Sequence, residues 1–183
     1  MKISYLILIF LKELGKGYYS KLELNSKLFF LSLYLHSNIS FKDYHYGPYS
    51  LDIEDNFSKL EGAGFINSFP CNKLNNIKIK NKKLNDTYAF NLSKNSELLI
   101  KNIIVKNYAN DVKKIKEYIN ISKELDDFII FSTATIYSLL IKKYGTKPDK
   151  KTFIDSLKKS EWKLQESNID VAYQYLNKME LVK

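Results

Sequence analysis

The chain has 183 residues, of which 45% are hydrophobic and 27% charged, and this balance excludes an intrinsically disordered protein. All 29 basic residues are lysine, and the formal net charge is +9. A single cysteine, Cys71, excludes an intrachain disulfide, which fits a reducing, cytoplasmic location.

The positive charge is unevenly distributed along the chain. Residues 1–71 carry seven lysines and seven carboxylates, residues 72–94 carry six and one, and residues 95–183 carry sixteen and twelve. The net charges of these segments are therefore 0, +5 and +4, so the middle segment holds more than half of the excess. Lysine attracts phosphate as a point charge, whereas arginine, the usual bidentate reader of guanine, is absent.

Two apolar helices are predicted at the start of the chain. Residues 3–14 are predicted to form a helix that ends at Gly15 and Gly17. Its apolar run, Ile3–Leu11, is followed by charged residues and not by a small-residue cleavage site, so we expect a core helix rather than a signal peptide. Residues 20–37 carry leucines at spacings of three and four, which is typical of a helix with one buried face. The charged residues Lys21, Glu23 and Lys27 fall outside that leucine face.

The next predicted element begins in a short motif that contains Gly47 and Pro48. A residue before proline is disfavoured in the helical conformation, whereas proline suits the first position of a helix, so we predict a helix from about Pro48. Gly62 and Gly64 would end it. We interpret the motif as a structural corner formed by Tyr46, Gly47, Pro48, Tyr49 and Ser50.

A lysine-rich β-hairpin is predicted over about residues 76–92, after a short strand at 65–69. Asn76–Lys80 and Thr87–Leu92 alternate apolar and polar residues, and a polar turn lies between them. Lysines on its outer face and tip could contact phosphates along a nucleic acid, or could protect the hairpin edge from aggregation. These lysines are Lys73, Lys78, Lys80, Lys82 and Lys83.

Four helices are predicted in the second half of the chain, at residues 94–119, 125–144, 150–159 and 168–180. The apolar run Phe128–Ile141 is too short to span a bilayer, so we expect no membrane association. The predicted fold is mainly α with a small β-hairpin. A winged-helix-like half, residues 1–93, packs on a helical half, residues 94–183, and the two form one compact unit.

Several short patterns resemble a family of small prokaryotic proteins that includes the SocA-like antitoxin (Panacea) domain and the YwgA-like proteins. The matching patterns are Lys21-Leu22, Tyr46–Ser50, Leu60 with Gly64-Phe65-Ile66, and Tyr88 to Leu92. The resemblance implies a winged-helix-type, non-catalytic module, and the antitoxin members neutralise protein toxins. The family helix usually reads Lys-Leu-Gln-Lys-Leu, whereas this chain has Glu23 in place of the glutamine, so no role of that glutamine is carried over.

Catalysis is not indicated by the residue pattern. The chain has no phosphate-binding loop, no dinucleotide-binding glycine pattern and no zinc-ligand spacing. His36, His45 and Cys71 are not spaced in a way that demands a catalytic pair. We therefore expect no enzyme, no cofactor and no metal.

Two binding functions remain. The predicted helix after Pro48 is acidic and would repel phosphate from the position where a winged-helix protein reads DNA, although acids there also complement the helix dipole. We therefore expect a non-enzymatic, antitoxin-like module that binds another protein, such as a toxin or defence-type effector. The alternative is a DNA-binding regulator that uses the lysine-rich hairpin; the oligomeric state stays open. The expected protein contacts are Asp52, Asp55 and the loop tyrosines Tyr18, Tyr19, Tyr44 and Tyr46.

Overall fold

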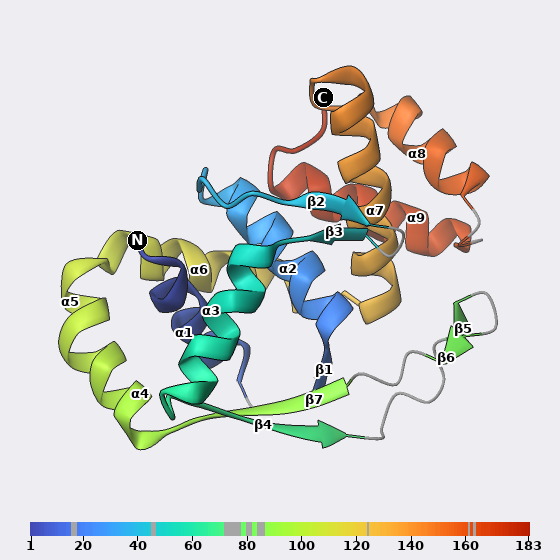
Figure 1. Ribbon diagram of the computed structural model, residues 1–183. Helices are drawn as coiled ribbons and strands as arrows, with labels where there is room; N and C mark the ends of the chain where they lie inside the picture. The colour runs from blue at the N-terminus through green and yellow to red at the C-terminus, as the bar shows by residue number, and fades with distance from the viewer. Residues whose placement is uncertain are drawn as a thin grey trace.

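Figure 1 shows the computed structural model, which describes residues 1–15, 18–44, 47–71, 78–79, 82–83, 87–123, 125–160, 162 and 164–183. The elements up to residue 71 are α1 (Ile3–Leu14), β1 (Tyr18–Ser20), α2 (Lys21–Tyr34), β2 (Lys42–Tyr44), β3 (Gly47–Tyr49), α3 (Leu51–Gly62) and β4 (Ile66–Cys71). The strands that follow are β5 (Lys78–Ile79), β6 (Lys82–Lys83) and β7 (Thr87–Leu92). The remaining helices are α4 (Lys94–Leu99), the π-helical turn η1 (Ile100–Ile104), α5 (Val105–Asn107), α6 (Ala109–Ser122), α7 (Asp127–Tyr144), α8 (Lys150–Lys159) and α9 (Glu166–Lys178).

The fold is mainly helical with short antiparallel strands, as the sequence predicts. The expected bounds of α1 and α8 are confirmed, because their apolar spacing is bounded by clear start and stop residues. Among the described residues, no helix is both long enough and apolar enough to cross a membrane.

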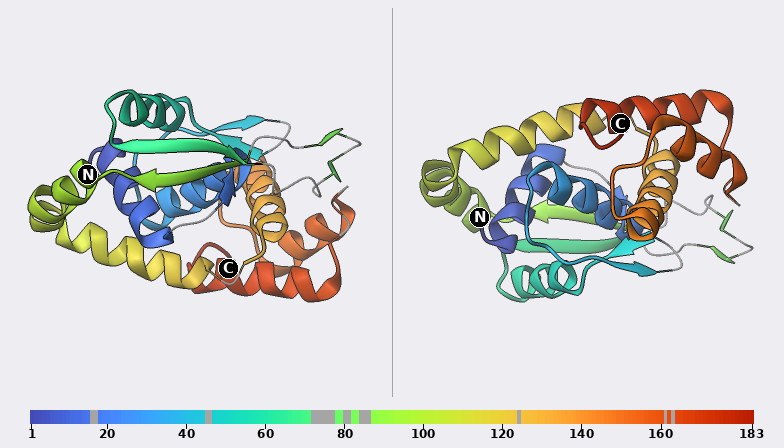
Figure 2. Two further views of the ribbon diagram at one scale, coloured as in Figure 1. Left: turned by 90° about the horizontal axis from the view of Figure 1, so that it is seen from below. Right: turned by 90° about the horizontal axis from the view of Figure 1, so that it is seen from above.

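The core is built around α1 and α2. Residues 6–11 of α1 and 23–32 of α2 are buried without interruption. Figure 2 shows these two helices between α3 on one side and α6 and α9 on the other. The hydroxyl of Tyr118 in α6 donates to the carbonyl of Lys27 in α2 at 2.7 Å, and Tyr175 in α9 donates to Tyr118 at 3.1 Å. The two halves of the chain therefore share one core.

The three-stranded sheet has the order β1-β7-β4, and all its strands are antiparallel. The prediction that residues 76–80 pair with 87–92 is wrong for the described part, because β7 pairs with β4 and β1 while β5 pairs with β6. Alternation of apolar and polar residues indicates which face of a strand is buried, but it does not indicate the partner strand.

The Gly47–Ser50 segment forms a strand and a helix cap rather than the start of a helix at Pro48. Pro48 lies in β3 opposite Asp43 of β2, and both Gly47 and Pro48 are buried. Helix α3 begins at Leu51, where the side chain of Ser50 accepts a hydrogen bond from the Ile53 amide at 3.4 Å. Serine is a preferred N-cap residue, so Ser50, two residues after the proline, determines where the helix begins.

The helix predicted over residues 94–119 is interrupted. A π-helical turn at Ile100–Ile104 is followed by a break at Tyr108, whose backbone has φ −133° and ψ 37°. The interruptions bend the chain around α1 (Figure 1), so that Ile100 and Ile104 before the break and Val112 after it are all buried. Helix α9 begins at Glu166, two residues before the predicted start at residue 168, and no side chain caps it.

Candidate protein-binding groove

A groove of about 290 Å³ lies between α2, α3 and the sheet. Its floor is apolar apart from the buried Asn25 of α2, and the rings of Phe57 in α3 and Phe90 in β7 meet there with centroids 5.6 Å apart. The spacing of four between Leu24 and Leu28 places both side chains on one side of α2, as the leucine pattern predicts. The apolar lining residues are Leu24, Leu28, Ile53, Phe57 and Phe90.

Polar side chains form the rim of this groove. Glu54, Ser58 and Glu61 follow one another on α3 at spacings of four and three, so they lie along one flank of that helix. Glu61 accepts a hydrogen bond from the hydroxyl of Ser68 in β4, which fixes the carboxylate at the edge of the sheet. The groove therefore combines an apolar floor with two carboxylates, an arrangement that can hold an apolar side chain flanked by positive charge.

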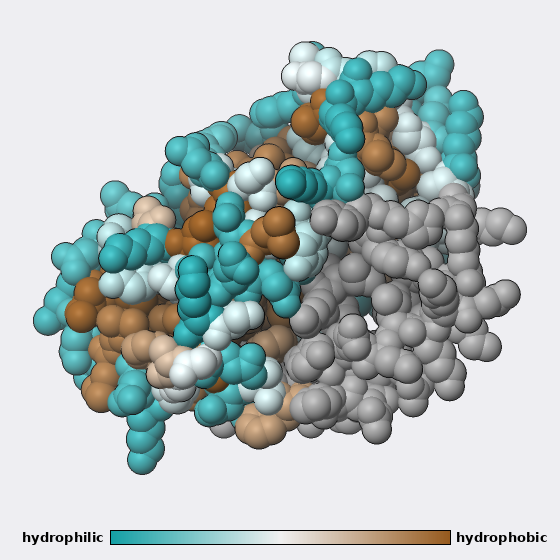
Figure 3. Space-filling model, viewed as in Figure 1, coloured by the Kyte–Doolittle hydropathy of each residue, from teal (hydrophilic) through white to brown (hydrophobic). Residues whose placement is uncertain are grey.

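Asp52 and Asp55 lie on a different flank of α3. Successive helical residues are rotated by about 100°, so Asp52 and Glu54 point to opposite sides. Both aspartates are exposed, as predicted, but neither lines the groove. Figure 3 shows mostly polar and charged residues (teal and white) over α3, left of the centre of the view. The acidic pattern was visible in the sequence, but which acids border a groove depends on the packing of α3 against α2.

The loop tyrosines do not gather into one described patch. Tyr19 is half buried, and its hydroxyl donates to the carbonyl of Leu14 at 3.1 Å. Burial, together with the nearby carboxylates of Glu23 and Asp127, raises the pKa of Tyr19 to about 12. The backbones of Tyr18 and Tyr44 belong to β1 and β2, while their side chains and all of Tyr46 lie outside the described residues.

A buried ionisable cluster lies between α2 and α7, and sequence reasoning missed it. The Lys27 ammonium is 2.6 Å from a carboxylate oxygen of Glu23, with side chains only 7% and 2% exposed. Burial raises the pKa of Glu23 to about 7, because Lys27 offsets the lost hydration only in part and Asp127 adds a like charge. The prediction that Glu23 and Lys27 lie outside the buried face is wrong, because α2 is covered on all sides and buries its charges as a pair.

The lysines of the predicted wing are only partly placed. Lys78 is paired with Lys83 in the small β5–β6 hairpin, and Lys82 lies in β6, but nothing is described of their side chains. Lys73 and Lys80 lie outside the described residues. These lysines all belong to the segment that links β4 to β7.

No group of three or more histidine, cysteine, aspartate or glutamate side chains that could hold a metal occurs in the described part of the chain. His36 is exposed just after α2, whereas His45 and the Cys71 side chain lie outside that part. Neither a scan against protein-family models nor a search of curated proteins finds a match to this chain.

Proposed function

We propose that the protein is a non-enzymatic, antitoxin-like module that binds a partner protein through the groove between α2 and α3. The observation that carries the proposal is the apolar groove floor bordered by Glu54 and Glu61. Helix α3 has four carboxylates and one lysine, in a protein whose net charge is +9. A local acidic, apolar surface in a basic protein favours a partner of opposite charge.

The partner chemistry follows from the size and lining of the groove. At about 290 Å³ the groove falls just below the range of about 300–1,000 Å³ that is typical of small-molecule sites. It suits one or two apolar side chains of a protein segment, such as an amphipathic helix. Lysine or arginine residues next to those side chains would pair with the rim carboxylates. The partner is therefore a basic protein, such as a toxin or effector.

A winged-helix arrangement of the first half is part of the same proposal. The order α1, β1, α2, α3, β4, β7 and the sheet order β1-β7-β4 fit such a module, with the β2–β3 hairpin inserted before α3. Helix α3 would then occupy the position of the DNA-reading helix. Its carboxylates would repel phosphates, which favours a protein over DNA as the partner at this face.

The experiment is site-specific photo-cross-linking in the native organism. A photoreactive amino acid at Ser58, on the groove rim, should capture a basic protein, whereas the same residue at exposed Gln174 on α9 should not. The captured protein is then purified, and its affinity is measured for Glu54→Gln/Glu61→Gln and for Asp52→Asn/Asp55→Asn. We expect at least tenfold weaker binding for the glutamate pair and a smaller change for the aspartate pair. If the aspartate pair weakens binding more than the glutamate pair, the interface lies on the outward face of α3. If the photoreactive residue at position 58 captures no protein, the proposal is contradicted.

A DNA-binding regulator is the second candidate, because the link between β4 and β7 carries Lys78, Lys82 and Lys83. If these lysines contact phosphates, duplex DNA should bind at roughly 50 mM salt and dissociate steeply as salt rises. Lys78→Glu/Lys80→Glu should then abolish the binding without changing the melting temperature. Absence of binding at low salt would leave the protein-binding function alone.

A further inference from the structure

A second and larger cavity, of about 790 Å³, lies on the other side of Phe90, between α1, β7, the π-helical turn and α6. We infer that this cavity binds a small phosphate-bearing ligand of the nucleotide class. It is lined by three lysines and one carboxylate, that of Glu97. It shares Phe90 with the groove proposed for the protein partner and no other lining residue.

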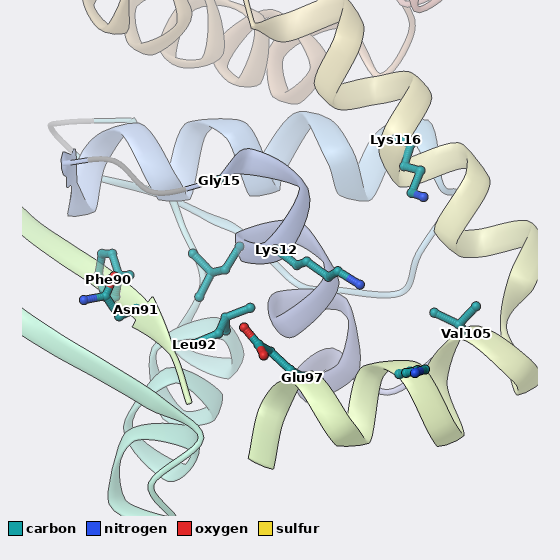
Figure 4. Close-up of a pocket in the computed structure, with 10 residues that line it drawn as sticks. Lys12, Gly15, Phe90, Asn91, Leu92, Glu97, Val105 and Lys116 are labelled. Carbon is teal, nitrogen blue, oxygen red and sulfur yellow. The ribbon is translucent and has the colours of Figure 1, made fainter. Parts of the chain in front are cut away.

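The three lysines come from elements far apart in the sequence. Lys12 lies in the last turn of α1, Lys101 in the π-helical turn and Lys116 on α6. Figure 4 shows the ammonium groups of Lys12 and Lys116 directed into the same space between α1 and α6. Lys116 lies 3.8 Å from a carboxylate oxygen of Glu13, whereas Lys12 and Lys101 form no ion pair within the described part of the chain. Two of the three cations are therefore available to an anion.

Like charges around one concave surface raise the local positive potential, because the low-dielectric walls of a cleft focus the field. A solvated lysine on a convex surface has no such effect. A phosphate group that binds here would offset the charges of Lys12 and Lys101, which have no ion pair among the described residues. The position of the lysines thus favours an anion with two or more negative charges.

The rest of the lining favours a ligand with an apolar or aromatic portion. Leu11, Leu92 and Val105 form apolar wall, and Phe90 adds an aromatic ring. The volume lies well inside the range of about 300–1,000 Å³ that is typical of small-molecule sites. A nucleotide carries both parts, a base that packs against apolar wall and phosphates that pair with the lysines.

The backbone at the cavity is a second, independent observation. The π-helical turn at Ile100–Ile104 buries Ile100 and Ile104 fully and leaves Lys101 exposed at the cavity. Single π-helical turns are rare, and they occur frequently at functional sites. An unbroken α-helix over these residues would orient Lys101 differently relative to Lys12 and Lys116.

Isothermal titration calorimetry on the full chain tests the inference with ATP, pyrophosphate and adenosine. We expect ATP to bind most tightly, pyrophosphate to bind more weakly and adenosine not to bind, with affinity falling as salt rises. Lys12→Gln and Lys101→Gln should each weaken ATP binding at least fivefold, because neither lysine has a competing ion pair. The matched control is Lys151→Gln, an exposed lysine on α8 that should leave the affinity unchanged.

Three outcomes would overturn the inference. One is the absence of binding for ATP and pyrophosphate at low salt. Another is equal weakening by Lys151→Gln, which would mean that net charge alone attracts the anion. The third is a single-stranded oligonucleotide that binds far more tightly than ATP through Lys12 and Lys101, which would make the surface a polymer site. Melting curves of each variant establish that it folds, so a loss of binding is not confused with unfolding.

Discussion

Gly47 shows how one residue can fix the approach of two elements. Its φ is +99°, a conformation that other L-residues rarely adopt. A Cβ at this position would lie 2.9 Å from the hydroxyl oxygen of Thr135 and 3.5 Å from the Phe131 ring, both in α7. The glycine therefore allows β3 to lie directly against α7.

Gly47→Ala should destabilise the protein by more than the cost of its conformation, which is about 1–2 kcal/mol. The control is Gly64→Ala, because Gly64 also has a positive φ, +71°, but a Cβ there would meet nothing within 4 Å. Urea denaturation should therefore show a larger loss of free energy of unfolding for Gly47→Ala. Adding Thr135→Ala should recover part of that difference. Equal losses at the two glycines would mean that contact with α7 is unimportant.

The residues of the motif also show what a sequence can predict. Glycine before proline correctly indicates a special backbone position, because both residues restrict the chain locally. The predicted start of α3 at Pro48 is three residues too early. The helix begins at Leu51, because Ser50 caps it there. The burial of Glu23 and Lys27 could not be predicted, because it depends on α7, which lies a hundred residues further along the chain.

At the scale of elements, the contact between α2 and α7 is unusual because ionisable groups are buried in it. Glu23 and Lys27 belong to α2, Asp127 lies in the first turn of α7, and Tyr19 of β1 borders the cluster. The Lys27 ammonium is also 5.7 Å from the centre of the Tyr19 ring. Proton binding at this junction is therefore linked to the stability of the packing between the helices.

We expect the free energy of unfolding to fall as pH rises from 5 to 8. The pKa of Glu23 is about 7 in the folded protein, above the value of about 4.3 in an unfolded chain. Its contribution is therefore complete below about pH 4 and is lost as pH rises through about 7, and about 3 kcal/mol of that loss falls between pH 5 and 8. Glu23→Gln should flatten this dependence in urea titrations at several pH values. The control is Glu166→Gln, because this side chain is 85% exposed and its removal should leave the pH dependence unchanged. If Glu23→Gln also leaves the pH dependence unchanged, Glu23 is not its source.

The positions of the helices were predicted better than their interruptions and the pairing of the strands. Apolar spacing identified nearly every helix, because a buried face must repeat with the helical period. The same spacing continues through the π-helical turn and the break at Tyr108, so the sequence pattern did not indicate these two interruptions. Strand pairing between β4 and β7 was missed for a related reason, since both strands alternate in a way that fits several partners.

The whole molecule depends on contacts between its two halves. The ring of Phe30 in α2 meets Tyr137 of α7 and Tyr175 of α9, with centroid distances of 5.9 and 5.2 Å. All three side chains are buried. Without the second half, the aromatic core of the first half would be exposed to water. Burial of apolar side chains is a main source of stability in a small protein.

A fragment of residues 1–93 should not fold by itself. We expect its circular dichroism to show no cooperative thermal transition, while the complete chain unfolds in a single step. Co-expression with a fragment of residues 94–183 should restore a soluble complex, because the missing contacts return in trans. Cooperative unfolding of the isolated 1–93 fragment would show instead that the first half is an independent domain.

The uninterrupted burial of α2 constrains how this protein can diverge. Ten consecutive residues, 23–32, have no solvent-facing side, so nearly every substitution there changes packing or buries a new polar group. A saturation mutagenesis screen should find this helix the least tolerant segment and the outward flank of α3 among the most tolerant. Distant homologues should accordingly share the size pattern of α2 long after their surface residues have drifted apart.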